Sequence, residues 1–252
     1  MEINGKKVVV IGGASGMGRA SAELLARRGA DVAVLDREGS DGKVVAEGIG
    51  GTFYPVDVTD FTGTEETLQA AVDKLGGLHV VITTAGGGVA MRTLSKSGPH
   101  DLEAFQSTVN LNLIASFNIS RLAAAHMSKN EPEDEERGVI INTASIAAFE
   151  GQIGQVAYAA TKAGIVGMTL PISRELASLG IRCVTIAPGV FMTPMMAGLS
   201  KEAQDSLGRQ VPFPPRLGRP EEFAQLVESI VEIPTLNGEV IRLDGAIRLQ
   251  PR

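Results

Sequence analysis

Short apolar runs alternate with longer segments of helical character along the whole chain. Seven of these runs are read as strands, and most of them have β-branched residues on both faces, which is typical of strands buried on both sides in a parallel sheet. The segments between them are long enough for crossover helices. Repeated βα units predict an α/β fold with a doubly wound, mostly parallel sheet of seven strands and helices on both faces. The expected strands are residues 6–13, 30–36, 51–57, 78–86, 138–145, 181–189 and 238–245.

One long stretch, from Val190 to Pro215, interrupts this alternation. An irregular segment of that length inside a compact domain is usually functional or disordered. We expect a substrate lid at about residues 190–215, formed by adaptable apolar side chains, although the same side chains would also suit a core. They are Phe191, Met192, Met195, Met196, Leu199 and Phe213. Because we find neither a repeat nor a linker, residues 1–252 are predicted to form a single domain.

Composition and charge exclude several classes of partner. The net charge of −6, from 23 basic and 29 acidic residues, argues against nucleic acid or an anionic membrane surface. No apolar run approaches the roughly 20 residues that a membrane helix requires. The single cysteine fits a reducing compartment, and the first strand begins so close to Met1 that we expect no targeting peptide and a cytoplasmic location. The three histidines show no ligand spacing, so we expect no metal.

Three glycines stand between the first expected strand and the first expected helix. Gly12, Gly16 and Gly18 allow a sharp turn and a close approach of backbone to a pyrophosphate, and Ser15 and Met17 complete the turn. The helix that follows adds partial positive charge at its N-terminus. The spacing G-xxx-G-x-G differs from the commoner G-x-G-x-x-G, but the strand–turn–helix context favours a dinucleotide site in a Rossmann fold.

The carboxyl ends of the next strands are expected to complete this cofactor site. Asp36 ends the second strand, where a carboxylate accepts the ribose hydroxyls of NAD and repels a 2′-phosphate. Arg37 follows it and would favour NADP, but Asp36 occupies the strand end where the ribose should lie, so we predict NAD. Further contacts at the third and fourth strand ends are expected from Asp57, Val58, Ala85 and Gly86.

A serine, a tyrosine and a lysine are spaced as a catalytic group downstream of the fifth strand. Tyr158 and Lys162 lie one helical turn apart, and Ser145 ends the strand before them. A tyrosine has an ordinary pKa near ~10, and a neighbouring ammonium is expected to lower it. Tyr158 would then act as general acid and base, and Ser145 would hold the substrate oxygen. Each residue alone also has a structural explanation, as a solvated helix pair or a strand-end cap.

Taken in order, these motifs resemble the short-chain dehydrogenase/reductase family over essentially the whole chain. The family's TAG sequence matches residues 84–86, and its PG pair matches Pro188 and Gly189. The resemblance implies that Pro188, Gly189, Val190 and Thr193 contact the cofactor near the nicotinamide. It also implies that the catalytic tyrosine and lysine contact the cofactor themselves.

The resemblance implies a fourth catalytic residue, an asparagine that holds a water linking Lys162 to solvent. Asn112 fits this position better than Asn110. The chain departs from the family pattern at Ile11, where a threonine is usual, and at residues 83–84, where an asparagine usually precedes the AG pair. We expect these departures to alter local hydrogen bonds and to leave the chemistry intact.

Within the family the chain is most similar to the type II 3-hydroxyacyl-CoA dehydrogenases, also called 17β-hydroxysteroid dehydrogenases type 10. The matching stretches are long, and include residues 138–172 and 237–248. This resemblance implies a homotetramer that uses NAD to interconvert (S)-3-hydroxyacyl-CoA and 3-oxoacyl-CoA in fatty-acid or branched-chain breakdown. It also implies some action on steroid alcohols and ketones.

Substrate contacts are less determined by the sequence. Gln152 and Gln155 lie between the catalytic serine and tyrosine, where they either donate to a thioester carbonyl or belong to a polar loop. The phosphates of a CoA tail require cations outside the pocket. Lys96, Lys201 and Arg209 are the candidates.

Two other functions remain open. One is an NADPH-dependent 3-oxoacyl-carrier-protein reductase or steroid dehydrogenase of the same fold, against which Asp36 argues. The other is a non-catalytic dinucleotide-binding protein, which predicts loss of Ser145, Tyr158 or Lys162. All three residues are present.

Overall fold

One seven-stranded sheet forms the centre of the molecule in a computed structural model of the chain. The strand order is β3-β2-β1-β4-β7-β8-β9, and every pairing is parallel, so the predicted α/β fold class is confirmed. The structure describes residues 1–251. The side chain of Met195 and the whole of Arg252, which were assigned to the lid and the domain, lie outside the described part. The strands are β1 (Lys7–Ile11), β2 (Asp31–Asp36), β3 (Thr52–Pro55), β4 (Val80–Thr83), β7 (Gly138–Thr143), β8 (Ile181–Pro188) and β9 (Val240–Leu243).

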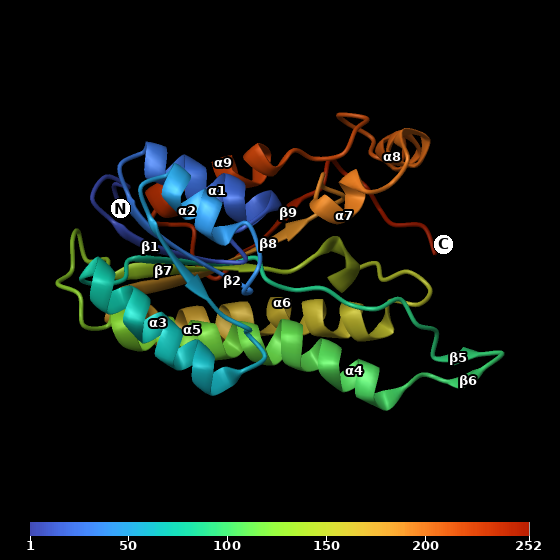
Figure 1. The fold of residues 1–252 in the computed structure, drawn as a ribbon, viewed down its shortest axis with the longest axis horizontal. Helices are drawn as coiled ribbons and strands as arrows, with labels where there is room; N and C mark the ends of the chain where they lie inside the picture. The colour runs from blue at the N-terminus through green and yellow to red at the C-terminus, as the bar shows by residue number, and fades with distance from the viewer. Residues whose placement is uncertain (252) are drawn as a thin grey trace.

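Neighbouring residues of the central strands face opposite layers of helices. Val8 and Val10 of β1 pack into one core, and Val9 and Ile11 pack into the other. All four are buried, which explains why such strands show continuous apolar runs in the sequence. Figure 1 shows the two helical layers on either side of the sheet. One layer holds α1 (Gly16–Arg27), α2 (Gly42–Gly48) and α9 (Pro220–Glu232), and the other holds α3 (Phe61–Leu75), α5 (Ala115–Met127) and α6 (Val156–Leu176).

The strand order reverses at β1, which has β2 on one side and β4 on the other. Ile11, the last residue of β1, lies opposite Leu35 of β2 and Thr83 of β4. The loops that leave these three strands therefore meet at one edge of the sheet. Such a switch point is where doubly wound sheets bind their ligands.

A long helical rod crosses the sheet beside this edge. It consists of α4 (Leu102–Val109), a π-helical turn η1 (Asn110–Ile114) and α5 in unbroken succession. Single π-turns inside α-helices are rare and frequently occur at functional sites. This one carries Asn112, which the resemblance assigned to catalysis.

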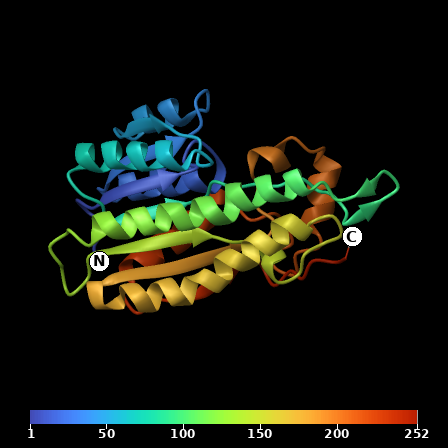
Figure 2. The same cartoon turned by 90° about the horizontal axis from the view of Figure 1, so that it is seen from below.

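The expected lid contains two short helices, α7 (Pro194–Ala197) and α8 (Lys201–Gly208). Their first turns are capped by the hydroxyls of Thr193 and Ser200, which accept the backbone N–H groups of Met196 at 3.4 Å and Ala203 at 3.3 Å. A small antiparallel hairpin, β5 (Leu94–Ser95) with β6 (Gly98–Pro99), was not expected from the sequence. Figure 2 shows it projecting beyond the helices at one end of the molecule. The remaining elements are the 3-10 turns η2 (Ile146–Ala148) and η3 (Ala177–Leu179).

Two properties of the described residues bear on other functions. None of their helices is both long enough and apolar enough to cross a bilayer. Within the same part of the chain, no group of three or more His, Cys, Asp or Glu side chains is placed to hold a metal ion. Cys183 is buried on β8, and burial raises the pKa of its thiol to about 12.

Candidate active site

The glycine turn after β1 is folded against the end of β4. Gly12 has φ of 83°, a conformation that residues with a side chain rarely adopt. A Cβ on Gly18 would lie only 2.2 Å from the carbonyl oxygen of Gly12 and 2.5 Å from Thr84 Oγ1. The Thr84 hydroxyl is 3.1 Å from the carbonyl oxygens of both Ile11 and Gly12, close enough to donate to either. The Thr84 hydroxyl thus ties the turn to the end of β4.

Asp36 closes the same turn from the end of β2. Its carboxylate accepts the backbone N–H of Ala14 at 2.9 Å and that of Arg37 at 2.8 Å. The side chain of Arg37 is exposed. The Asp36 carboxylate therefore lies beside the glycine turn, where the ribose of a dinucleotide was expected.

The other predicted cofactor contacts lie at the same edge of the sheet. Asp57 accepts both the backbone N–H and the hydroxyl of Thr59, at 2.9 and 2.7 Å, and these bonds lower the pKa of its carboxyl group. Val58 beside it is buried. Both follow β3, while Ala85 and Gly86 follow β4. The backbone N–H of Ala85 donates to the carbonyl of Ile11, which holds this loop against β1.

The segment after β8 brings the expected lid over the glycine turn. Gly189 donates its backbone N–H to Leu243 of β9 at 2.9 Å, which fixes the start of the segment. A Cβ on Gly16 would lie 3.6 Å from Pro194 Cδ, so the first residue of α7 sits beside the turn. Val190 and Thr193 lie in the short connection between these two points.

The apolar residues of the expected lid differ in burial. Phe191 is buried in the main core, as the structural alternative predicted. Phe213 is 79% exposed and Leu199 is 40% exposed, so neither belongs to a core. Only part of the segment therefore matches an apolar lid.

Ser145, Tyr158 and Lys162 come together where β7 passes into α6. Ser145 caps η2, and its hydroxyl accepts the backbone N–H of Ala147 at 3.1 Å. Lys162 is 4% exposed, and its Nζ donates to the carbonyl of Thr143 at 2.8 Å. The same Nζ lies 5.6 Å from the centre of the Tyr158 ring. The Ser145 hydroxyl lies close enough to the Tyr158 phenol to lower its pKa.

The pKa of Tyr158 does not move as the sequence argument expected. Burial raises it above its ordinary value, and the nearby Ser145 hydroxyl only partly offsets this rise. Burial also lowers the pKa of the Lys162 ammonium to about 8. The expectation of a lowered phenol pKa is therefore wrong for the chain alone, because desolvation outweighs the effect of Ser145, the one group that lowers it.

Asn112 lies in the π-helical turn and faces this group. Its Oδ1 accepts the N–H of Gly87 at 2.9 Å, and its Nδ2 donates to the Gly87 carbonyl at 2.7 Å and to Thr161 Oγ1 at 3.1 Å. A Cβ on Gly86 would be 2.7 Å from Asn112 Oδ1 and 3.3 Å from Lys162 Nζ. Asn112, Lys162 and the loop after β4 therefore converge.

Asn110, the alternative for this role, is exposed, whereas Asn112 is fully buried. Thr161, which holds Asn112, was not expected from the sequence. Its only signal was its position next to Lys162 on the same helix.

The two candidate substrate glutamines are engaged within their own loop. Gln155 Oε1 accepts the backbone N–H of Gln152 at 3.0 Å, and Gln152 Nε2 donates to the carbonyl of Gln250 at 2.9 Å. Gln152 therefore fastens the loop to the C-terminal segment. Gln155, whose Oε1 is occupied, retains an amide group that can donate.

A clasp of charged residues holds the loop between Ser145 and Tyr158 against β9 and the C-terminal segment. Arg242 of β9 binds Glu150 through two bonds of 2.7 and 3.0 Å and lies over the Phe149 ring at 5.1 Å. Asp244 and Arg248 extend the network: Asp244 accepts from Arg242 at 2.8 Å and from Arg248 at 3.2 Å. We call Glu150, Arg242, Asp244 and Arg248 the C-terminal clasp. Nothing in the sequence pattern pointed to it.

Comparisons with known proteins show what the whole chain is similar to. A family model described as short chain dehydrogenase matches residues 6–204. The chain is 52% identical to 3-hydroxyacyl-CoA dehydrogenase type-2 of Drosophila melanogaster, over 96% of this chain and 97% of that protein. It is 51% identical to the Homo sapiens protein of the same name, over 99% and 97%. A crystal structure of 3-hydroxyacyl-CoA dehydrogenase type-2 from Mycobacterium avium superposes with a TM-score of 0.93 at 41% identity, covering 98% of this chain and 97% of that one.

Proposed function

The chain belongs to the short-chain dehydrogenase family, and we propose that it catalyses the NAD-dependent interconversion of (S)-3-hydroxyacyl-CoA and 3-oxoacyl-CoA. Relatives with 51–52% identity over nearly the whole chain bear the name of this activity. The observation that carries the proposal is the convergence of Asn112, Ser145, Tyr158 and Lys162 beside the glycine turn.

The residues present fit a nicotinamide dinucleotide. The first turn of α1 has no acidic side chain, so its backbone N–H groups favour a pyrophosphate. Asp36 would accept the ribose hydroxyls and disfavour the 2′-phosphate of NADP, which supports NAD. When bound, the nicotinamide would accept a hydride from the alcohol carbon or return it to the ketone.

The protein side chains would manage the proton of the substrate hydroxyl. The Ser145 hydroxyl holds the substrate oxygen, and the Tyr158 phenol oxygen takes the hydroxyl proton during oxidation and returns it during reduction. Because burial raises the pKa of this phenol, the phenolate must be stabilised by the Lys162 ammonium and by the positive charge of oxidised nicotinamide. Asn112 would hold a water through which Lys162 exchanges protons with solvent.

The remaining predictions extend this proposal. Residues 1–252 would form one domain that assembles as a homotetramer in the cytoplasm, as the family resemblance and the sequence suggest. Gln155 would donate its amide to the thioester carbonyl. The alternative of an NADPH-dependent reductase would require Arg37 to outweigh Asp36 in choosing the cofactor.

The test is the oxidation of NADH, followed at 340 nm, with acetoacetyl-CoA as substrate, beside NADPH and beside a steroid ketone. We expect turnover with NADH and the thioester. A Tyr158→Phe variant should bind NADH like the wild type and lose on the order of 10²–10⁴-fold in rate. Activity with NADPH alone would replace the proposal by the reductase alternative, and a fully active Tyr158→Phe variant would refute the mechanism.

A further inference from the structure

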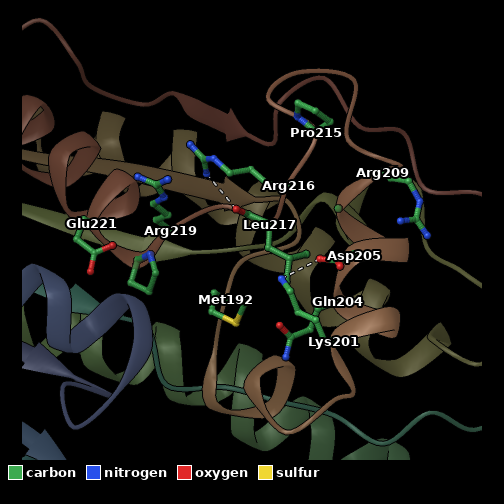
Figure 3. Close-up of a pocket in the computed structure, with 12 residues that line it drawn as sticks. Met192, Lys201, Gln204, Asp205, Arg209, Pro215, Arg216, Leu217, Arg219 and Glu221 are labelled. Atoms are coloured by element: carbon green, nitrogen blue, oxygen red, sulfur yellow. Dashed lines mark hydrogen bonds and ion pairs between the residues drawn. The ribbon is translucent and has the colours of Figure 1, made fainter.

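A cavity of about 630 Å³ opens between α8, the segment at residues 215–219 and the first turn of α9 (Figure 3). Its wall includes four cations and two carboxylates in a chain whose net charge is −6. The cavity is therefore a local basic site on an acidic protein. We call it the basic cavity, and its charged residues are Lys201, Asp205, Arg209, Arg216, Arg219 and Glu221.

Two of the four cations are already paired. Lys201 lies 2.9 Å from Asp205, as a solvated pair of low strength. Arg216 binds Glu222 through two bonds of 2.9 and 2.6 Å, which help to lower the pKa of that carboxyl to about 2. This second pair fixes the segment between the cavity and α9.

The other two cations, Arg209 and Arg219, form no ion pair within the described residues. Within residues 1–251, neither the Arg209 nor the Arg219 guanidinium forms an ion pair with a carboxylate within 4 Å, and Arg219 bonds Glu222 only through its backbone N–H, at 2.7 Å. In Figure 3 they stand on opposite sides of the cavity. Guanidinium groups are well suited to phosphate because they present several donors in a planar fork.

The basic cavity is built from the segment that covers the glycine turn. Met192 lines it, and its backbone N–H donates to Gly218 at 2.8 Å, while Gly218 donates to Val190 at 2.9 Å. Gln204 of α8, also in the wall, donates to the carbonyls of Met196 and Leu199 at 3.1 and 3.0 Å. A ligand bound here would therefore steady both lid helices.

We propose that the basic cavity binds the 3′-phosphorylated adenosine diphosphate end of coenzyme A, with Arg209 and Arg219 as its main phosphate contacts. This proposal rests on the proposed function, because that reaction supplies a substrate whose far end carries three phosphate groups. The structure places Lys201 and Arg209, two of the three cations named from the sequence, at one site. Lys96 belongs instead to the turn of the β5–β6 hairpin, and it does not line this cavity.

The experiment compares acetoacetyl-CoA with acetoacetyl-pantetheine, which lacks the nucleotide end. In Arg209→Gln and Arg219→Gln, we expect the KM for acetoacetyl-CoA to rise roughly three- to tenfold, as for loss of one partly solvated phosphate contact. The kcat, the KM for NADH and the KM for acetoacetyl-pantetheine should not change. Arg27→Gln, which removes one exposed charge from α1, is the matched control and should behave like the wild type.

Three results would overturn the proposal. One is an unchanged KM for acetoacetyl-CoA in both variants. A second is an equal rise for both thioesters, which would mean a structural effect on the lid. A third is a rise in the KM for NADH alone, which would assign the cavity to the dinucleotide.

Direct binding separates this proposal from the proposed function. Calorimetry with adenosine 3′,5′-bisphosphate should detect binding to the wild type and to Arg27→Gln, and weaker binding to the two cavity variants. If the enzyme turns over neither thioester, the proposed function fails, and this calorimetry still decides whether the cavity takes the nucleotide. Equal binding to all four proteins would refute it.

Discussion

The glycine turn permits a sharp prediction at Gly18, in the first turn of α1. In Gly18→Ala the new Cβ would meet the Gly12 carbonyl oxygen at 2.2 Å and Thr84 Oγ1 at 2.5 Å, whereas ordinary contacts begin at 3.4 Å. The backbone must therefore move by about 1 Å, because Gly12 O is not a side-chain atom that can rotate away. The movement would also loosen the bonds of the Thr84 hydroxyl to the turn.

The expected loss of stability in Gly18→Ala is the sum of opposing contributions to the free energy of unfolding. Alanine in a helix is about 1 kcal/mol better than glycine, whereas overpacking costs about 1–3 kcal/mol. Weakening the Thr84 hydrogen bonds adds about 1 kcal/mol. We expect a net destabilisation of about 1–3 kcal/mol, which lowers the Tm by several degrees in a domain of this size.

Gly48→Ala is the matched control, because a Cβ on Gly48, at the end of α2, meets nothing within 4 Å. It should be neutral or stabilising by up to about 1 kcal/mol. Thermal melts and fluorescence titration with NADH measure both variants. We expect Gly18→Ala to weaken NADH binding at least tenfold and Gly48→Ala to leave it unchanged. If Gly18→Ala melts and binds like the wild type, the argument that the turn has no room for a side chain is wrong.

Three further predictions concern the catalytic group and the clasp. Burial lowers the pKa of Lys162 from 10.5 to about 8. Burying the charged ammonium therefore lowers the free energy of unfolding by its full amount below pH 8, and this loss of stability disappears as pH rises from 8 to 10.5. Lys162→Met should abolish activity and flatten that part of the pH–stability profile in thermal melts. Asn112→Ala should lower the free energy of unfolding, measured in urea, by about 2–4 kcal/mol. The substitution removes three side-chain hydrogen bonds and leaves the N–H and the carbonyl of Gly87 without the partner they have in Asn112. Arg242 lowers the pKa of Glu150, so the clasp should stabilise the protein above pH 4.5 and fail as pH falls below it. Arg242→Gln should remove that acid-side dependence, and an unchanged profile would show that the clasp contributes no stability.

The sequence predicts the sheet well because every central strand carries its own signal. Residues such as Val8–Ile11 are apolar on both faces, and burial by two helical layers leaves no other pattern for them. The glycine turn and the Tyr158–Lys162 spacing are equally local, so their positions could be predicted from short stretches. Asn112 required the family resemblance, because nothing nearby in the sequence marks a π-helical turn.

Features that depend on distant partners could not be predicted. Glu150 and Arg242 are 92 residues apart, and no local sequence motif around either residue indicates that the two pair. The direction of the Tyr158 pKa was missed for a related reason. Spacing shows which charge is near a phenol, but only the folded chain shows how much water has been removed from it.

The bonds of Asp36 have a consequence for redesign of the cofactor site. One carboxylate oxygen holds the backbone N–H of Ala14, so the residue that would select the ribose also keeps the glycine turn closed. A substitution that admits a 2′-phosphate, such as Asp36→Ser, would therefore weaken the turn that must receive the pyrophosphate. The choice between NAD and NADP and the conformation of the glycine turn thus depend on the same side chain. A change from NAD to NADP therefore requires a first mutation that stabilises the glycine turn and only then a replacement of Asp36. In the opposite order, the first variant would have a weakened pyrophosphate site.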